Sequence, residues 1–148
     1  MHIQAGALHN SGTLKSDYLA LSAAQDLTHT GRIESGQWLF LHAGRDLKLD
    51  GTDRARGTLT SGTDTLSGDM VIQAGRDVRI DRSDLLSAAP KTAPEAADNR
   101  IGGTGRVILT AGSDATLTDR ARVEAQTDLI GTAGGVLTLQ PNGQVLAA

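Results

Sequence analysis

The stretch "LFLHAGRDLKLD" at Leu39–Asp50 is repeated almost position for position as "MVIQAGRDVRID" at Met70–Asp81. Two related phrases complete a set of four close copies, "LALSAAQD" from Leu19 and "VILTAGSD" from Val107. A fragment of an earlier copy, "HIQAG", stands at His2–Gly6. Because self-similarity at this scale is typical of repeat architectures, the fold has to be inferred from the repeat unit.

Within each copy, apolar and polar residues alternate with a period of two. Position five of every copy is alanine, and two further apolar positions follow the turn in most copies. This alternation predicts β-strands with one face inward and one outward. The expected inward residues are Leu19, Leu21, Ala23, Leu27, His29, Leu39, Leu41, Ala43, Leu47, Leu49, Met70, Ile72, Ala74, Val78, Ile80, Val107, Leu109, Ala111, Ala115 and Leu117.

The Ala-Gly-x-Asp segment between two strands predicts a corner of the chain. We expect its glycine to permit a positive φ and its aspartate to close an Asx-type turn through its own carboxylate. A second similarity, between "LHNSGTL" at Leu8–Leu14 and "LTHTGRI" at Leu27–Ile33, adds another glycine corner and a short third strand to each unit.

The spacing of the copies reveals two insertions. The closing aspartates, Asp26, Asp46, Asp77 and Asp114, are 20, 31 and 37 residues apart, and we interpret "VLTLQPNG" near the C-terminus as a degenerate later copy. The sequence therefore predicts a single all-β domain over residues 1–148, a parallel β-solenoid of about five to six coils. Inserted loops are expected at about 51–69 and 82–106. "TLTSGTDTL" in the first is expected to form a hairpin, and the prolines of the second should exclude it from the ladder.

Composition argues against several classes of function. The net charge is −3 with lysine and arginine scattered, so no nucleic-acid partner is expected, and no apolar run is long enough to insert into a membrane. No cysteine is present and the histidines have no ligand-like spacing, so neither a metal nor a cofactor is expected. Since Met1 begins inside a repeat, we expect the chain to be a fragment of a longer protein.

The phrases "GALHNSGTL", "LALSAAQDL", "HAGRDLKLDG" and "QAGRDVRID" resemble the haemagglutinin repeats of filamentous haemagglutinin-like exoproteins. These are bacterial adhesins and contact-dependent growth inhibition effectors exported by two-partner secretion. The resemblance implies a right-handed parallel β-helix within a secreted filament at the cell surface. It implies a non-catalytic segment that builds the rod displaying adhesive or toxin domains, and it carries no catalytic residues.

The same resemblance implies partners. The full-length parent would use an outer-membrane transporter, and the segment itself would meet a receptor or glycan on a host or neighbouring cell. Because exposed terminal coils offer unpaired strand edges, we also expect end-to-end self-association of the fragment. The two insertions depart from the regular pattern of these repeats, around Met70 and Val107.

Two groups of residues are candidates for partner binding. Phe40, Val71 and Ile108 share an outward position and would form an exposed apolar ridge. We expect an insertion to fold over this ridge; the alternative is that Tyr18 and Trp38 pack beside it. The inserted loops would supply Arg54, Arg56 and Lys91, because loops on a rigid scaffold commonly carry specificity.

Other interpretations receive less support from the sequence. A column of corner aspartates could bind calcium, but the period of the calcium-binding nonapeptide repeats is missing. Arg45 and Arg76 are expected to offset the repulsion between these acids. A carbohydrate-active enzyme, which some β-helices are, would need a pair of carboxylates that nothing in the sequence singles out.

Overall fold

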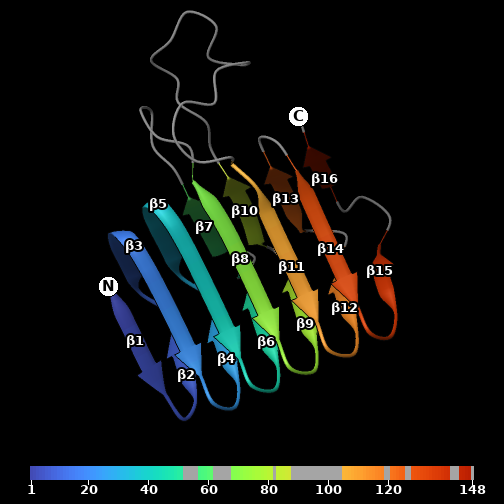
Figure 1. Ribbon diagram of the computed structural model, residues 1–148, viewed down its shortest axis with the longest axis horizontal. Coiled ribbons are helices and arrows are strands. Elements are labelled where there is room, and N and C mark those ends of the chain that lie inside the picture. Colours follow the sequence, from blue (N-terminus) through green and yellow to red (C-terminus); the bar gives the residue numbers. More distant parts are fainter. Residues whose placement is uncertain are drawn as a thin grey trace, which may run out of the picture.

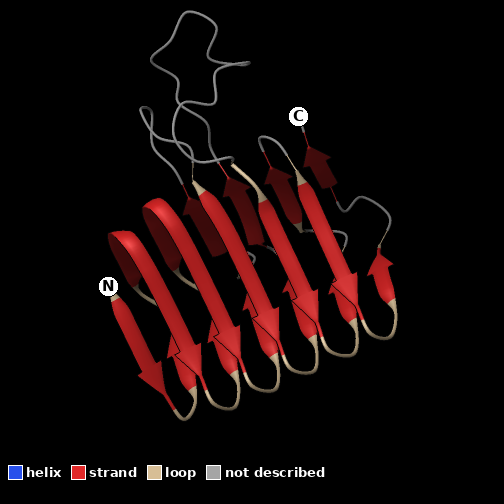
Figure 2. Ribbon diagram, in the orientation of Figure 1, coloured by secondary structure: helices blue, strands red, loops and turns tan. Residues whose placement is uncertain are grey.

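The computed structural model describes residues 1–51, 57–61, 68–81, 83–87, 105–118, 121–125, 128–140 and 144–147. These residues form strands joined by tight corners, with no helix among them, and all the strand pairs are parallel (Figures 1 and 2). The strands form a ten-stranded and a six-stranded sheet, an arrangement compatible with a parallel β-helix or solenoid. The described part of the chain contains no helix that could cross a membrane.

The ten-stranded sheet is bent, so that it has two wings. Strands β3 (Thr13–Ala23) and β5 (Arg32–Ala43) run through both wings, and their pairing shifts at a bulge between Ser16 and Tyr18. The front wing holds β1 (His2–Ala5), the second halves of β3 and β5, β8 (Asp69–Ala74), β11 (Val107–Ala111) and β14 (Leu129–Ala133). The rear wing holds their first halves, β7 (Gly57–Ser61), β10 (Ser83–Ser87), β13 (Arg122–Ala125) and β16 (Gln144–Ala147).

Along the chain, each strand of the six-stranded sheet follows a strand of the front wing and precedes a strand of the rear wing. It consists of β2 (Leu8–Asn10), β4 (Leu27–His29), β6 (Leu47–Asp50), β9 (Val78–Asp81), β12 (Ala115–Leu117) and β15 (Leu137–Leu139). The chain thus passes repeatedly from the front wing through the short sheet to the rear wing, and we name each such passage a circuit. The described residues make six circuits, each paired with the next (Figure 1).

The alternation predicted from the sequence is confirmed. All the inward residues expected on the front wing and in the short sheet are buried, His29 among them. The rear wing adds Ile33, Leu59, Leu85 and Val123 to the same core. A thin core of Leu, Ile, Val and Ala is therefore continuous through the stack, because each circuit covers the apolar side chains of its neighbour.

The two insertions do not interrupt the stack. Leu39 pairs with Met70, and Met70 pairs with Val107, in unbroken register across both insertions. The departure from the regular repeat pattern around Met70 and Val107 therefore leaves the ladder continuous. Parts of the expected loops are themselves strands. β7 pairs in parallel with β5 on one side and with β10 on the other. The rest of the expected hairpin lies outside the described residues.

The last circuit begins earlier in the chain than the sequence predicts. Its front strand is β14, "LIGTA", which pairs with β11 from Val107↔Leu129 to Ala111↔Ala133. "VLTLQPNG" therefore spans the second strand of this circuit and is not the start of a copy. The signal is hidden because Gly131 stands where the other copies carry Leu or Ile, which removes the period-two pattern.

The glycine of the corner has a different role from the one expected. Among the glycines of the described chain, only Gly105 has a positive φ. At Gly75, an added Cβ atom would lie 2.2 Å from the carbonyl oxygen of Gly44, and at Gly112 it would lie 2.0 Å from that of Gly75. Glycine is required because the backbones of successive circuits approach closely at the corner, where no side chain fits.

Candidate binding surface

An outward row of apolar residues crosses the front wing. Register places Ala20 opposite Phe40, Phe40 opposite Val71, and Val71 opposite Ile108. These four side chains are half-buried, and Ile130 continues the row with 46% of its surface exposed. The predicted alignment of Phe40, Val71 and Ile108 is confirmed. They are partly shielded by one another, since neighbouring strands bring side chains of one row close together.

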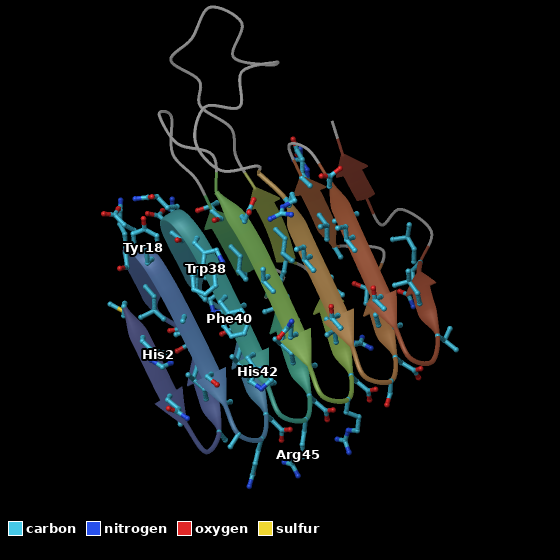
Figure 3. The ribbon with its side chains drawn as sticks, viewed as in Figure 1. His2, Tyr18, Trp38, Phe40, His42 and Arg45 are labelled. Atoms are coloured by element: carbon cyan, nitrogen blue, oxygen red, sulfur yellow. The ribbon has the colours of Figure 1, made fainter. Side chains whose placement is uncertain are left out.

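The aromatic residues of the chain gather at one end of this row. The rings of Trp38 and Phe40 are parallel within 3°, with centroids 5.5 Å apart. The ring of His42 continues the series 6.1 Å from Phe40, and Tyr18 is the register partner of Trp38 on β3 (Figure 3). The predicted packing of Trp38 beside the row is thus confirmed. We name Tyr18, Trp38, Phe40 and His42 the aromatic cluster.

The strand alternation explains why this cluster lies outside. Trp38, Phe40 and His42 are two residues apart along β5, so all three point to the face opposite Leu39 and Leu41. The rings lean on one another in an offset stack, a favourable arrangement at these centroid distances. Tyr18 and Trp38 nevertheless remain 57% and 37% exposed. Aromatic surface therefore faces solvent at this place, whereas the buried core contains no Phe, Tyr or Trp.

Polar side chains border the aromatic cluster. The Tyr18 hydroxyl donates a hydrogen bond of 2.7 Å to Gln37 Oε1. In the register row of His42, the neighbouring positions are Ser22 and Gln73. An apolar strip edged by amides and hydroxyls can contact the apolar face of a partner and hydrogen-bond at its border, as protein and sugar ligands require.

The other predicted binding residues fall elsewhere. Arg54, Arg56 and Lys91 lie outside the described residues, and so do most residues of the two insertions expected to cover the outward row. The tetrapeptide Asp-Arg-Ala-Arg that contains Arg54 and Arg56 recurs at Asp119–Arg122. In this second copy, Ala121 is buried and Arg122 is paired with Glu124 at 2.6 Å. Arg122 is therefore an ion-paired, half-exposed residue at the start of β13, directly after a core residue.

The corner aspartates form a ladder between circuits. The Asp77 backbone N–H donates to Asp46 Oδ1 at 3.4 Å, and the Asp114 N–H donates to Asp77 Oδ1 at 3.1 Å. The expected Asx turn is therefore wrong, because each carboxylate accepts a bond from the following circuit. A sequence read one copy at a time cannot reveal a partner that lies one circuit away.

Arginines complete two levels of this ladder. Arg45 Nε and Nη2 donate to the two Asp26 carboxylate oxygens at 3.1 and 2.6 Å, and Arg76 binds Asp46 in the same two-pronged way. The hydrogen bond from Arg45 lowers the pKa of Asp26, and that from Arg76 lowers the pKa of Asp46. The prediction that these arginines offset the acids is confirmed.

The polar groups of the described residues do not gather into a metal site. No three histidine or acidic side chains among them come together in a way that could hold a metal ion. His29 is buried, and its Nδ1 lies 3.0 Å from Asn10 Nδ2 in the neighbouring circuit. The predicted inward position of His29 is thus confirmed.

Comparison of the chain with protein-family models, with curated proteins and with solved structures finds no match. The resemblance of its repeats to those of filamentous exoproteins therefore stays a prediction from the sequence. On the described surface, the outward row and the aromatic cluster are the features that support a functional proposal.

Proposed function

We propose that the chain is a right-handed parallel β-helix that serves as a non-catalytic rod segment of a secreted, filamentous bacterial surface protein. In this role it holds adhesive or toxin domains away from the cell and presents an adhesive surface of its own. The handedness, the secretion and the filament follow from the resemblance of the repeats.

The observation that carries the rod proposal is the continuity of the ladder across unequal repeats. Strands at every level of the front wing pair with those of the next, whether the spacing is 20, 31 or 37 residues. Asp26, Asp46, Asp77 and Asp114 each accept a backbone bond from the following circuit. The apolar layer inside is repeated in the circuits between the first and the last. Such a stack gains stability from nearest neighbours and extends in one direction, which suits a spacer.

The rod proposal is tested by removing one circuit in register. Deleting residues 18–37 joins Asp17 to Trp38, which is the register partner of the lost Tyr18. The shortened protein should fold, keep its β-sheet circular dichroism, and lose about 4.8 Å of length by X-ray scattering. Deleting residues 18–27 is the matched control, because it removes half a circuit and places β5 out of register. If both deletions unfold the protein equally, the circuits are not interchangeable units and the rod proposal is wrong.

The adhesive part of the proposal is supported by the aromatic cluster. Exposed aromatic side chains contribute large contact areas with little loss of conformational entropy when they bind. The expected partner is a receptor or glycan on a host or neighbouring cell. Binding of the purified chain to cells and to a glycan array should fall at least about tenfold for Trp38→Ala, the loss of one hot-spot contact.

A matched control keeps the adhesion test specific. Arg79→Gln alters an exposed side chain of the short sheet, away from the cluster and its polar border. Unchanged binding by Trp38→Ala, with a normal unfolding transition, would remove the cluster from the proposal. A second candidate, binding through the inserted loops, then predicts loss of binding on deletion of residues 91–99 or on replacement of Arg54 and Arg56.

A further inference from the structure

The aromatic cluster lies on the face of a sheet and not at an edge. Along the part that carries Trp38, Phe40 and His42, β5 is paired with β3 on one side and with β8 on the other. The backbone N–H and C=O groups of this part of β5 are therefore used within the ladder, so a peptide cannot bind here by adding a strand. A ligand of this face has to be recognised by side chains alone.

Nine outward side chains of β3, β5 and β8 form this part of the face, in three register rows. The rows are Tyr18, Trp38 and Asp69, then Ala20, Phe40 and Val71, and then Ser22, His42 and Gln73. The middle row is apolar, and both of the other rows carry polar groups. An apolar centre between two polar borders suits a ligand that has an apolar face and polar groups around its rim.

The charges around the cluster do not favour an anionic ligand. Asp69 is the only carboxylate among the nine side chains, and none of the nine is a lysine or arginine. Arg106 neutralises Asp69, since its backbone N–H and its Nη2 donate to the two carboxylate oxygens at 2.9 and 3.0 Å. At the bend, Asp17 lies against Gly36, where an added Cβ would be 2.6 Å from Asp17 Oδ1. This second acid would repel an anion, so the chemistry of the face fits an uncharged ligand.

The parallel rings of the cluster are displaced sideways from one another along β5 (Figure 3). Parallel rings in full face-to-face contact would have centroids roughly 3.5–4 Å apart. The centroid distances are 5.5 Å from Trp38 to Phe40 and 6.1 Å from Phe40 to His42. Each ring therefore leaves part of a face uncovered by its neighbour. Trp38 is at the end of the series, with Phe40 as its stacking partner among the described rings, and 37% of its surface is exposed.

A pyranose sugar ring has the shape and the chemistry that these features require. Its axial C–H bonds form a flat apolar face, and the negative π-face of an aromatic ring attracts such polarised C–H groups. Its hydroxyls surround that face and both donate and accept hydrogen bonds. The hydrogen bond of 2.7 Å from the Tyr18 hydroxyl to Gln37 Oε1 holds a hydroxyl oxygen and an amide at one border of the cluster. Ser22 and Gln73 supply a hydroxyl and an amide at the other border.

We propose that the aromatic cluster binds an uncharged glycan, with the C–H face of one pyranose packed on the exposed part of the Trp38 ring. The hydroxyls of this sugar bind Tyr18 and Gln37. The sugar chain runs along β5, so that a neighbouring sugar contacts Phe40 and reaches the border formed by Ser22 and Gln73. The inference rests on the adhesive part of the proposed function, and it narrows the partner from any receptor or glycan to uncharged sugars.

The first test uses Trp38, the single tryptophan of the chain, as the reporter. The probes are the uncharged tetrasaccharides of β-1,4-linked glucose, xylose, galactose and N-acetylglucosamine, with sorbitol as a control that has hydroxyls but no ring. At least one tetrasaccharide should shift the Trp38 emission in a saturable way, and sorbitol should not. The anionic tetragalacturonate should bind at least about tenfold more weakly than the best uncharged probe, because Asp17 repels it. The inference is wrong if no uncharged probe binds, or if tetragalacturonate binds equally well.

Two variants test which groups recognise the sugar. Phe40→Leu keeps an apolar side chain and the Trp38 reporter, and it should weaken the best probe by about tenfold. Tyr18→Phe keeps the ring and removes the hydroxyl, and it should weaken the same probe by about two- to tenfold. Both variants should unfold at the same urea concentration as the unmodified chain, and Arg79→Gln should bind like it. If a proline-rich peptide binds instead, with affinity lost in Phe40→Leu and kept in Tyr18→Phe, the cluster recognises apolar surface and the inference is wrong.

Cell binding distinguishes a failure of this inference from a failure of the adhesive proposal. Oxidation of the cell-surface sugars with periodate should remove the binding that depends on Trp38, and the best uncharged tetrasaccharide should compete with it. If the Trp38-dependent binding survives periodate and is lost after protease treatment, the cluster is adhesive but its partner is a protein surface, and the inference is wrong. If Trp38→Ala abolishes sugar binding in solution and leaves cell binding unchanged, the sugar site is supported and the adhesive proposal fails.

Discussion

Leu49 and Leu139 hold the same position in the repeat and have very different surroundings. Register connects them through Ile80 and Leu117, one residue per circuit. Leu49 is completely buried, whereas 51% of Leu139 is exposed. The difference shows that an inward position is buried only when a circuit stacks on both sides of it. In this fold, burial is a property of neighbouring circuits and not of the unit itself.

The strongest test of this contrast is truncation at the two equivalent positions. Leu49→Ala should lower the free energy of unfolding by about 2–5 kcal/mol, because it leaves a cavity between two circuits. Leu139→Ala should cost less than about 1 kcal/mol, since much of its side chain is already in water. Urea unfolding at a concentration where the chain is monomeric measures both. Equal losses would mean that the last circuit is as well covered as the third.

The glycine corners give a second contrast between the interior and an end. Gly75→Ala should destabilise the protein by about 1–3 kcal/mol, because the new Cβ meets the Gly44 carbonyl and forces two backbones apart. Gly6→Ala should leave the stability of the monomer nearly unchanged, since no atom lies within 4 Å of its Cβ. Thermal unfolding of the two variants compares them directly. A loss at Gly6 as large as that at Gly75 would point to a conformational role for the corner glycine instead.

Replacing a buried serine between two circuits should have an effect on stability of similar size. The Ser35 hydroxyl donates to the Asp17 carbonyl at 2.9 Å and accepts from the Trp38 N–H at 3.0 Å, where β5 bends between the wings. Ser35→Ala should cost about 1–3 kcal/mol, because it leaves a buried backbone group without its partner. Ser22→Ala, at an outward position, is the control and should change urea unfolding little. Loss of Trp38 fluorescence anisotropy in Ser35→Ala alone would localise the effect to the bend.

The acidic corner should show the smallest effect and a defined pH dependence. The hydrogen bond from Arg76 lowers the pKa of Asp46 in the folded protein, so Asp46 contributes stability above its unfolded pKa. That contribution is lost as the pH falls through the lower, folded pKa. Arg76→Gln should raise the pKa of Asp46 toward its ordinary value, as measured by carboxyl NMR titration. Arg79→Gln, on the same circuit as Arg76, should leave the pKa of Asp46 unchanged. If the two variants raise this pKa equally, the cause is the change in net charge and not the hydrogen bond from Arg76.

Residue by residue, the sequence predicted the inward face well and the corners poorly. The period of two identified Leu39, Leu41, Met70 and Ile72 as core residues, because alternation along a strand is a local property. It also aligned Phe40, Val71 and Ile108 in one outward row. The candidate site was predicted only in part, since the parallel stacking of Trp38, Phe40 and His42 depends on side-chain geometry.

The sequence by itself determined that the chain is a repeated β-strand unit, which faces of its strands point inward, and where the extra residues enter. Only the tertiary structure explained why glycine and aspartate are required at the corner. Gly75 is small because another backbone lies against it, and Asp46 binds the Asp77 N–H and Arg76 of the next circuit. It also decided that β7 and β10 belong to the stack and that β14 begins the last circuit. The physical reason is that alternation is encoded in adjacent residues, whereas contact between circuits joins residues about 20 or more positions apart.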